Sequence, residues 1–188
     1  MNPKDELIGA FHRLGAFQWN PKEGFRLASG IISPYYVDCR TILAHPRPRY
    51  LVAQLAFEIL KDYSFALIGG LEIGAIPLAT CISDYGYTSN PRREWKTFVV
   101  RKQPKDHGLG KLIEGHIQSG EHALIVDDVL TTGGSILKAA EAARQQHLTV
   151  THSLVIVDRS DDQGASTLSP HGIQLLPLLT LEDLTQGN

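Results

Sequence analysis

The sequence predicts an α/β protein in which a central, mostly parallel sheet is flanked by helices on both faces. Short, continuous apolar runs recur after the first third of the chain, at 66–68, 97–100, 123–126, 154–157 and 175–179. Most of these runs are separated by segments of helical length, such as 76–85 and 134–146. Strands that are apolar along their whole length are typical of a parallel sheet that is covered on both faces. Ligands are then expected at the carboxyl ends of the strands.

The first third of the chain predicts two helices with a hairpin between them. Residues 5–16 and 48–63 place their apolar side chains on one helical stripe, which favours amphipathic helices. Residues 25–37 form two short strand-like runs around a Ser-Gly turn. These short strands predict a small N-terminal hood beside the main sheet.

Composition limits the classes of function. The chain has 188 residues, which fits one domain, and its net charge of −2 does not favour binding to long nucleic acids. No stretch approaches 18 consecutive apolar residues, so no membrane span is expected. The N-terminus does not have the pattern of a signal peptide. The two cysteines, Cys39 and Cys81, have no CxxC partner, which favours a reducing cytoplasm over a disulfide framework.

The segment from Leu124 to Ser135 carries the strongest chemical signal. Four apolar residues lead into Asp127 and Asp128, then into Val-Leu-Thr-Thr-Gly-Gly-Ser and a predicted helix. Glycines let several backbone N–H groups converge on one anion, and a helix start adds its dipole. Adjacent carboxylates at a strand end suit the paired hydroxyls of a ribose, or metal-bound water. A simple β–α turn is the alternative, whereas Walker and GxGxxG loops do not fit.

Two further segments predict anion contacts. In 101–110, four groups that can be cationic fall within seven residues: Arg101, Lys102, Lys105 and His107. Taken alone, this segment is better explained as a solvated charged loop, but beside a phosphate site its cations would stabilise a leaving pyrophosphate. Residues 68–77 form a second strand and glycine turn, in which Gly74 and Pro77 open a helix that could meet pyrophosphate. A packing turn is the alternative there.

These segments resemble the substrate-binding motifs of the type I phosphoribosyltransferases. Residues 126–134, Val-Asp-Asp-Val-Leu-Thr-Thr-Gly-Gly, are similar to the family motif for phosphoribosyl pyrophosphate (PRPP). In that family the two acids contact the ribose hydroxyls, the Thr–Gly loop holds the 5′-phosphate, and the glycine turn holds pyrophosphate. The resemblance implies PRPP contacts from Glu72, Ile73, Gly74, Arg101, Lys102, Lys105, His107, Asp127, Asp128, Val129, Leu130, Thr131, Thr132, Gly133, Gly134 and Ser135.

Other matches point to the orotate branch of the family. The pattern Arg-Lys-x-x-Lys-x-His-Gly at 101–108 resembles the catalytic loop of orotate phosphoribosyltransferases, which reaches the neighbouring subunit's active site. Residues 25–38 resemble the hood that covers the base, and Val157-Asp-Arg159 matches a strand end whose arginine pairs with the orotate carboxylate. The resemblance implies orotate contacts from Thr131, Arg159, Tyr35 and Tyr36. Taken alone, Arg159 is as readily a surface ion-pair partner, and the tyrosines are as readily core residues.

The resemblance therefore implies a single phosphoribosyltransferase domain over 1–188, with a hood mainly from about 1–40. The expected reaction is the Mg²⁺-dependent transfer of phosphoribose from PRPP to orotate in pyrimidine synthesis, by a homodimer with shared loops. The implied catalytic residues are Lys105, His107, Asp127 and Asp128, with Mg²⁺ bound mainly through PRPP. Ala28 and Gly74 stand where many bacterial members have lysine, so another nucleobase stays open as the acceptor. A PRPP-sensing regulator is the alternative from a different class.

Overall fold

A computed structural model of the chain describes residues 2–26, 32–103, 112–160 and 163–186. Its main sheet has six strands in the order β10-β9-β8-β5-β6-β7. Neighbouring strands are parallel except for β6 and β7, which are antiparallel. The mostly parallel sheet predicted from the apolar runs is therefore confirmed. Its strands are β5 (Leu67–Leu71), β6 (Lys96–Val100), β7 (Ile113–Gly115), β8 (His122–Leu130), β9 (Thr149–Asp158) and β10 (Gln174–Thr180).

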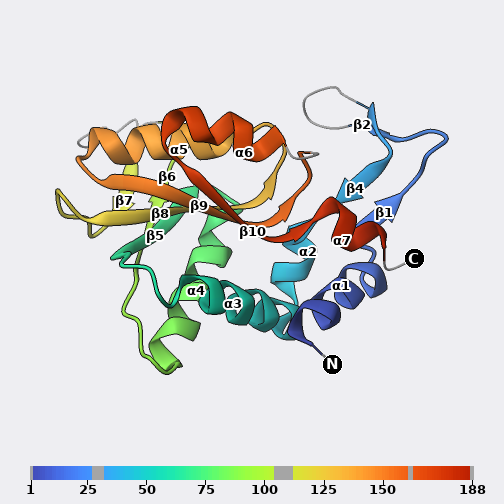
Figure 1. The fold of residues 1–188 in the computed structure, drawn as a ribbon, viewed down its shortest axis with the longest axis horizontal. Helices are drawn as coiled ribbons and strands as arrows, with labels where there is room; N and C mark the ends of the chain where they lie inside the picture. Colours follow the sequence, from blue (N-terminus) through green and yellow to red (C-terminus); the bar gives the residue numbers. More distant parts are fainter. Residues whose placement is uncertain (1, 27–31, 104–111, 161–162, 187–188) are drawn as a thin grey trace.

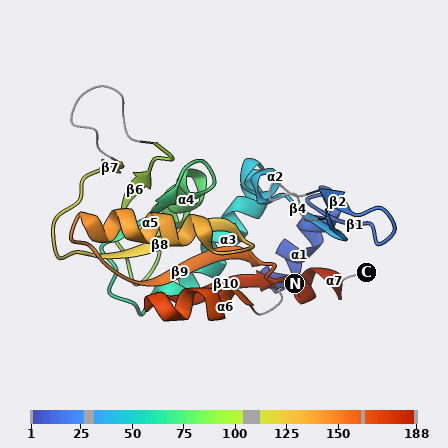
Figure 2. The same ribbon diagram turned by 90° about the horizontal axis from the view of Figure 1, so that it is seen from above.

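Helices cover both faces of this sheet (Figures 1 and 2). One layer contains α3 (Pro46–Leu60) and α4 (Ala75–Thr88), and the other contains α5 (Gly134–Gln145) and α6 (Gln163–Leu168). A short 3₁₀ turn, η1 (Ser169–His171), follows α6.

Two hydrophobic cores lie between the sheet and its two helical layers. Along β8 the buried side chains alternate, because Leu124 and Val126 pack into one core while Ala123 and Ile125 pack into the other. A strand that feeds two cores must be apolar at consecutive positions. This accounts for the uninterrupted apolar run in the sequence.

The N-terminal segment forms a separate layer at one end of the sheet (Figure 1). Two antiparallel pairs make up the hood, which we define as β1 to β4. Helices α1, α2 and α7 lie beside it, and α1 contacts both α3 and α7. The bounds are α1 (Pro3–Arg13), β1 (Phe17–Trp19), β2 (Phe25–Arg26), β3 (Ile32–Ser33), β4 (Tyr35–Val37), α2 (Cys39–Ala44) and α7 (Leu181–Thr185).

Several details differ from the sequence-based expectations. The first helix ends at Arg13, three residues earlier than the apolar stripe suggested. Strand β8 continues through Leu130, so the acidic pair lies within the strand and not beyond it. The short edge strand β7 and helix α2 were not predicted, because neither contains enough residues for a periodic pattern. Within the described ranges, no helix has the length and apolar character to cross a membrane.

Candidate active site

A cavity of about 920 Å³ lies where the carboxyl ends of the parallel strands face the hood. Strand order reverses between β5 and β8, and the helices that follow these two strands cover opposite faces of the sheet. Such a switch point leaves a crevice beyond the strand ends. The cavity is lined by Arg26, Ile32, Ser33, Pro34, Tyr36, Val37, Asp38, Cys39, Arg40, Leu71, Glu72, Ile73, Gly74, Lys102, Asp127, Asp128, Val129, Thr131, Thr132, Ser135, Arg159 and Ser160.

The loop between β8 and α5 presents an uncapped helix start to this cavity. Gly133 is the N-cap of α5 and has φ of +80°, a left-handed conformation that favours glycine. No side chain forms a capping hydrogen bond at this helix start. The hydroxyl-bearing Thr131, Thr132 and Ser135 line the cavity around it. Backbone N–H groups, a helix dipole and three hydroxyls are together suited to bind a phosphate.

Three predicted members of this loop, Leu130, Gly133 and Gly134, are not among the residues that line the cavity. Leu130 is 1% exposed and belongs to the core under α5, so its side chain is not available to a ligand. Gly133 is buried, and Gly134 begins the helix itself. Val129, in contrast, lines the cavity and also packs against the other core.

Asp127 and Asp128 are half-buried in the second half of β8. An Oδ1 atom of Asp127 accepts from the Asp128 N–H at 3.0 Å, and one of Asp128 accepts from the Val129 N–H at 3.0 Å. Burial, followed by the adjacent charge of Asp128, raises the pKa of Asp127 from its ordinary 3.8 to about 7. A carboxylate in this setting is stabilised by a ligand that donates hydrogen bonds or brings positive charge.

The turn between β5 and α4 lies against the acidic pair. Gly74 is the N-cap of α4, and this helix start also lacks a side-chain cap. A Cβ atom at Gly74 would meet Asp128 Oδ1 at 2.8 Å, closer than real Cβ atoms approach. Glycine here therefore lets the Asp128 carboxylate lie directly against the turn. Glu72 and the 70%-exposed Ile73 line the cavity beside it.

The predicted cationic residues are placed differently from one another. Lys102 lines the cavity. The side chain of Arg101 lines a smaller pocket of about 160 Å³ beside α5, and its Nη1 lies 3.8 Å from Glu114 Oε1. Lys105 and His107 lie outside the described residues.

The opposite end of the cavity is formed by Arg159 and the hood. Arg159 Nη2 donates to Ser33 Oγ at 3.0 Å and to the Tyr35 carbonyl at 3.3 Å. The Arg159 N–H donates to the Leu130 carbonyl at 3.1 Å, which ties the end of β9 to the loop between β8 and α5. Tyr36 lines the cavity, whereas Tyr35 stacks on Phe17 and packs against the core.

Several cavity residues were missed by sequence reasoning. Arg26 and Arg40 add two guanidinium groups, and Ser33 and Ser160 add hydroxyls. Arg40 pairs with Asp38 at 3.0 Å, and that bond raises the pKa of the arginine. The hood strands are too short to give a pattern that assigns facing side chains, so no local signal in the sequence identifies these residues.

The described residues contain no group of three or more His, Cys, Asp or Glu side chains placed to hold a metal ion. The acidic pair Asp127 and Asp128 supplies two carboxylates in the cavity. Two carboxylates suit Mg²⁺ that keeps water ligands and is held mainly by the phosphate oxygens of a substrate. The donor set therefore fits a substrate-borne ion and does not form a protein cage.

Comparison with known proteins assigns this architecture. Residues 39–170 match the family model described as the phosphoribosyl transferase domain. The chain is 40% identical over 161 residues to an orotate phosphoribosyltransferase of Aquifex aeolicus, covering 85% of this chain and 86% of that one. It is 35% identical over 187 residues to that of Pyrococcus horikoshii, covering 98% and 94%.

A solved relative has the same arrangement of elements. The crystal structure of Mycobacterium tuberculosis orotate phosphoribosyltransferase in complex with PRPP has a TM-score of 0.77 and 32% identity, and covers 97% of this chain and 99% of that chain. The two helix starts, the acidic pair and the Asp-Arg strand end therefore belong to a chain that matches these relatives over most of its length. The protein belongs to the phosphoribosyltransferase family and, within it, to the orotate phosphoribosyltransferases.

Proposed function

We propose that this protein, acting as a single domain, transfers the 5-phosphoribosyl group of PRPP to orotate, giving orotidine 5′-monophosphate and pyrophosphate in pyrimidine synthesis. One observation carries the proposal. Two uncapped helix starts flank a half-buried acidic pair at one end of the cavity, and an arginine held by the hood lies at the other. Such a cavity suits a ligand with two phosphate groups, ribose hydroxyls and an acidic base.

The phosphate end of the cavity orients the sugar. The N-terminus of α5, with Thr131, Thr132 and Ser135, would bind the 5′-phosphate, and Asp127 with Asp128 would accept hydrogen bonds from the ribose hydroxyls. The N-terminus of α4 would bind the pyrophosphate. Fixing the sugar at both phosphates leaves its anomeric carbon free to meet the base.

The reaction breaks the bond between the anomeric carbon and pyrophosphate and forms a bond to the base nitrogen. Negative charge grows on the leaving pyrophosphate, where cations stabilise the transition state. We assign this role to Lys102, Lys105 and His107, with Arg101 nearby. Mg²⁺, when bound with PRPP, supplies further charge neutralisation, and Asp127 and Asp128 are suited to accept from its water ligands.

The base end is suited to a planar, acidic ring. Arg159 presents a guanidinium group that can pair with a carboxylate in a bidentate manner, which lysine cannot reproduce. The ring of Tyr36 lines this end of the cavity. An orotate carboxylate would therefore be recognised where the hood meets the end of β9.

A parallel spectrophotometric assay tests this proposal. Orotate, uracil and purine bases are offered separately with PRPP and Mg²⁺, and the expected result is turnover with orotate alone. Turnover with a different base would change the acceptor and keep the chemistry. PRPP binding without turnover of any base would support a PRPP-sensing regulator in place of an enzyme.

We also propose a cytoplasmic homodimer in which Lys105 and His107 of each subunit's loop serve the partner's site, while Lys102 serves the site of its own subunit. Cys39 and Cys81 are not joined in a disulfide, which fits a reducing compartment. Mixing inactive Lys105→Ala chains with inactive Asp127→Asn/Asp128→Asn chains is expected to restore activity, because each hybrid has one site without a defect. A mixture that stays inactive would rule out loop sharing.

A further inference from the structure

A carboxylate in a pyrophosphate-binding turn needs a physical explanation. Glu72 lines the cavity at the start of the turn between β5 and α4, where its negative charge would repel a pyrophosphate. Its side chain is half-buried, and Oε1 accepts from the Lys102 N–H at 2.9 Å. The carboxylate is therefore directed toward the backbone of the neighbouring segment.

This bond continues the parallel ladder between β5 and β6. The last paired residues are Leu71 and Val100, and the Glu72 N–H donates to the Val100 carbonyl at 2.9 Å. The next ladder bond would join the Lys102 N–H to the backbone carbonyl of Glu72. The Glu72 carboxylate occupies the place of that carbonyl. The ladder is thus extended by one bond while the chain turns toward α4.

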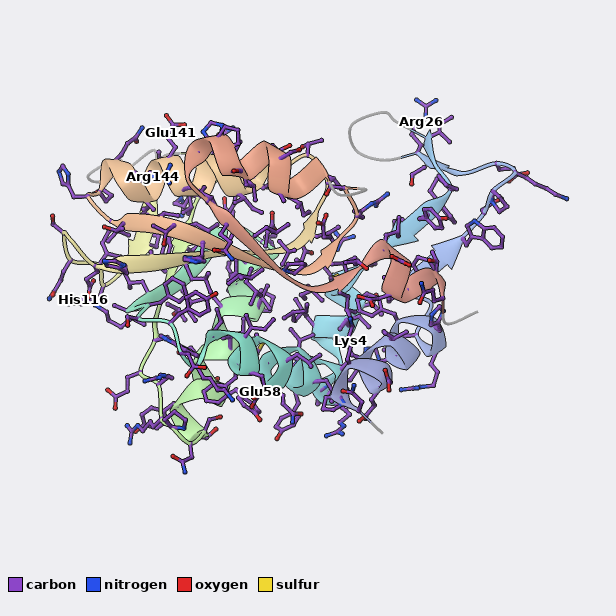
Figure 3. The ribbon with its side chains drawn as sticks, in the orientation of Figure 1. Lys4, Arg26, Glu58, His116, Glu141 and Arg144 are labelled. Atoms are coloured by element: carbon purple, nitrogen blue, oxygen red, sulfur yellow. The ribbon has the colours of Figure 1, made fainter. Side chains whose placement is uncertain are left out.

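The backbone of Lys102 is also held by a side chain from α5. Lys138 Nζ donates to the Lys102 carbonyl at 2.8 Å. Glu141, which Figure 3 labels, lies about one turn beyond Lys138 on α5. The preceding Arg101 N–H bonds to the Leu112 carbonyl at 2.8 Å. Both polar groups of the Lys102 backbone are therefore bound by charged side chains from two different elements.

We propose that Glu72 and Lys138 are positioning residues, which fix the Lys102 backbone from both sides so that its ammonium group serves the pyrophosphate end of the cavity. Charged partners make these hydrogen bonds stronger than neutral ones. A displacement of about 1 Å at a catalytic group can cost on the order of a hundredfold in rate. The inference rests on the proposed function, because it assumes that PRPP binds this cavity.

Steady-state kinetics and PRPP calorimetry on single variants test each contact. Glu72→Ala and Lys138→Met are each expected to lower kcat/KM for PRPP about tenfold. Glu72→Gln keeps an oxygen that can accept the Lys102 N–H and is expected to lose much less than Glu72→Ala, and Lys138→Arg less than Lys138→Met. Equal losses in Glu72→Ala and Glu72→Gln would show that charge, and not this hydrogen bond, is required, and would overturn the role of Glu72.

The matched control is the exposed pair Glu58 and Lys61, which are joined at 2.8 Å on the α3 side of the sheet. Figure 3 labels Glu58 on the face opposite Glu141. Glu58→Ala and Lys61→Met remove the same kinds of side chain far from the cavity. Neither is expected to change kcat/KM, and a tenfold loss in either would show that the measured effects are not local to Lys102.

A double-mutant cycle with Lys102→Ala gives the decisive readout. If Glu72 and Lys138 act through Lys102, then adding either substitution to Lys102→Ala changes kcat/KM less than about twofold. Effects that multiply in full would overturn the proposal. Wild-type protein that fails to bind PRPP would instead overturn the proposed function and this inference together, so the two failures are distinguishable.

Discussion

Two pairs of helix starts in the molecule differ in how their backbone N–H groups are satisfied. At the end formed by α1 and α7, each helix start is capped by a side chain: Asn2 accepts from the Lys4 N–H, and Thr180 and Asp183 form a capping box. At the cavity, α4 and α5 begin at glycines that supply no side-chain cap. The first arrangement satisfies backbone N–H groups within the chain, and the second leaves such groups without a side-chain cap, as an anion-binding helix start requires.

Carboxylates show the same contrast. Burial alone would raise the pKa of Asp183, but hydrogen bonds from Lys4 and Thr180 hold it below its ordinary value. Burial and the charge of Asp128 raise the pKa of Asp127 instead. A carboxylate that is paired within the protein stabilises the fold, whereas one that is buried beside a like charge lowers the stability of the ligand-free fold. The following changes break or sharpen this comparison.

The largest effect is expected from Lys105→Ala. If this lysine acts on the leaving pyrophosphate only in the transition state, kcat should fall about a hundredfold to a thousandfold, or roughly 3–4 kcal/mol. PRPP affinity measured by calorimetry should stay nearly unchanged. The exposed Lys61→Ala serves as the control. Wild-type turnover in Lys105→Ala would contradict the catalytic role of the loop.

Asp127→Asn should make the ligand-free protein more stable. Because the folded pKa of Asp127 lies above the ordinary 3.8, ionising this group costs stability as pH rises from about 3.8 to about 7. The neutral amide removes that cost, so the free energy of unfolding at pH 8 should rise by about 1–2 kcal/mol. Denaturant unfolding at pH 5 and pH 8 measures this difference. A variant that is less stable than wild type at pH 8 would contradict the pKa argument.

Glycine-to-alanine substitutions at two positions compare the cavity with the end formed by α1 and α7. Gly74→Ala places a Cβ against Asp128. The fold should persist, because the backbone at φ −57° accepts alanine. PRPP affinity should fall about tenfold, or roughly 1.4 kcal/mol. Gly9→Ala in α1 meets only the flexible end of Arg13 and should stabilise the helix by about 0.5–1 kcal/mol. Unchanged PRPP binding in Gly74→Ala would show that Asp128 does not need this close approach.

The smallest effect is expected at Asp183. Asp183→Asn removes the 2.9 Å ion pair with Lys4 but keeps an oxygen for the cap, so the loss should be about 0.5–1 kcal/mol. Since the folded pKa of Asp183 is lowered, its contribution is present above the ordinary value and is lost as pH falls below it. Denaturant unfolding of wild type and Asp183→Asn at pH 7 and pH 3 measures the loss of stability and its dependence on pH. Equal destabilisation at the two pH values would contradict the assignment.

Much of the fold could be predicted from the sequence, because a parallel sheet leaves a local record. Strands that feed two cores give uninterrupted apolar runs, as Leu124 to Val126 do in β8. The strand–loop–helix arrangement of 124–136 could also be predicted, since its glycines and hydroxyl side chains follow one strand directly. In contrast, β7 was missed because three residues at a sheet edge carry no period.

The site was harder to predict wherever it depends on contacts between distant segments. Ser33 and Arg159 are 126 positions apart, yet they are joined at 3.0 Å. The role of Glu72 toward Lys102 and the direction of Arg101 away from the cavity depend on how β5, β6 and α5 pack together. No local pattern encodes these contacts, so only the residue types could be inferred in advance.

The most direct test of the central claim is calorimetric titration of PRPP with Mg²⁺ into wild type, Asp127→Asn/Asp128→Asn and Asp183→Asn. If the cavity carboxylates are reserved for the ribose, the double variant should lose PRPP affinity, because neutral amides accept more weakly from hydroxyls than carboxylates do. Asp183→Asn should bind like wild type, since its carboxylate is used within the fold. Unchanged PRPP affinity in a folded Asp127→Asn/Asp128→Asn protein would contradict the account.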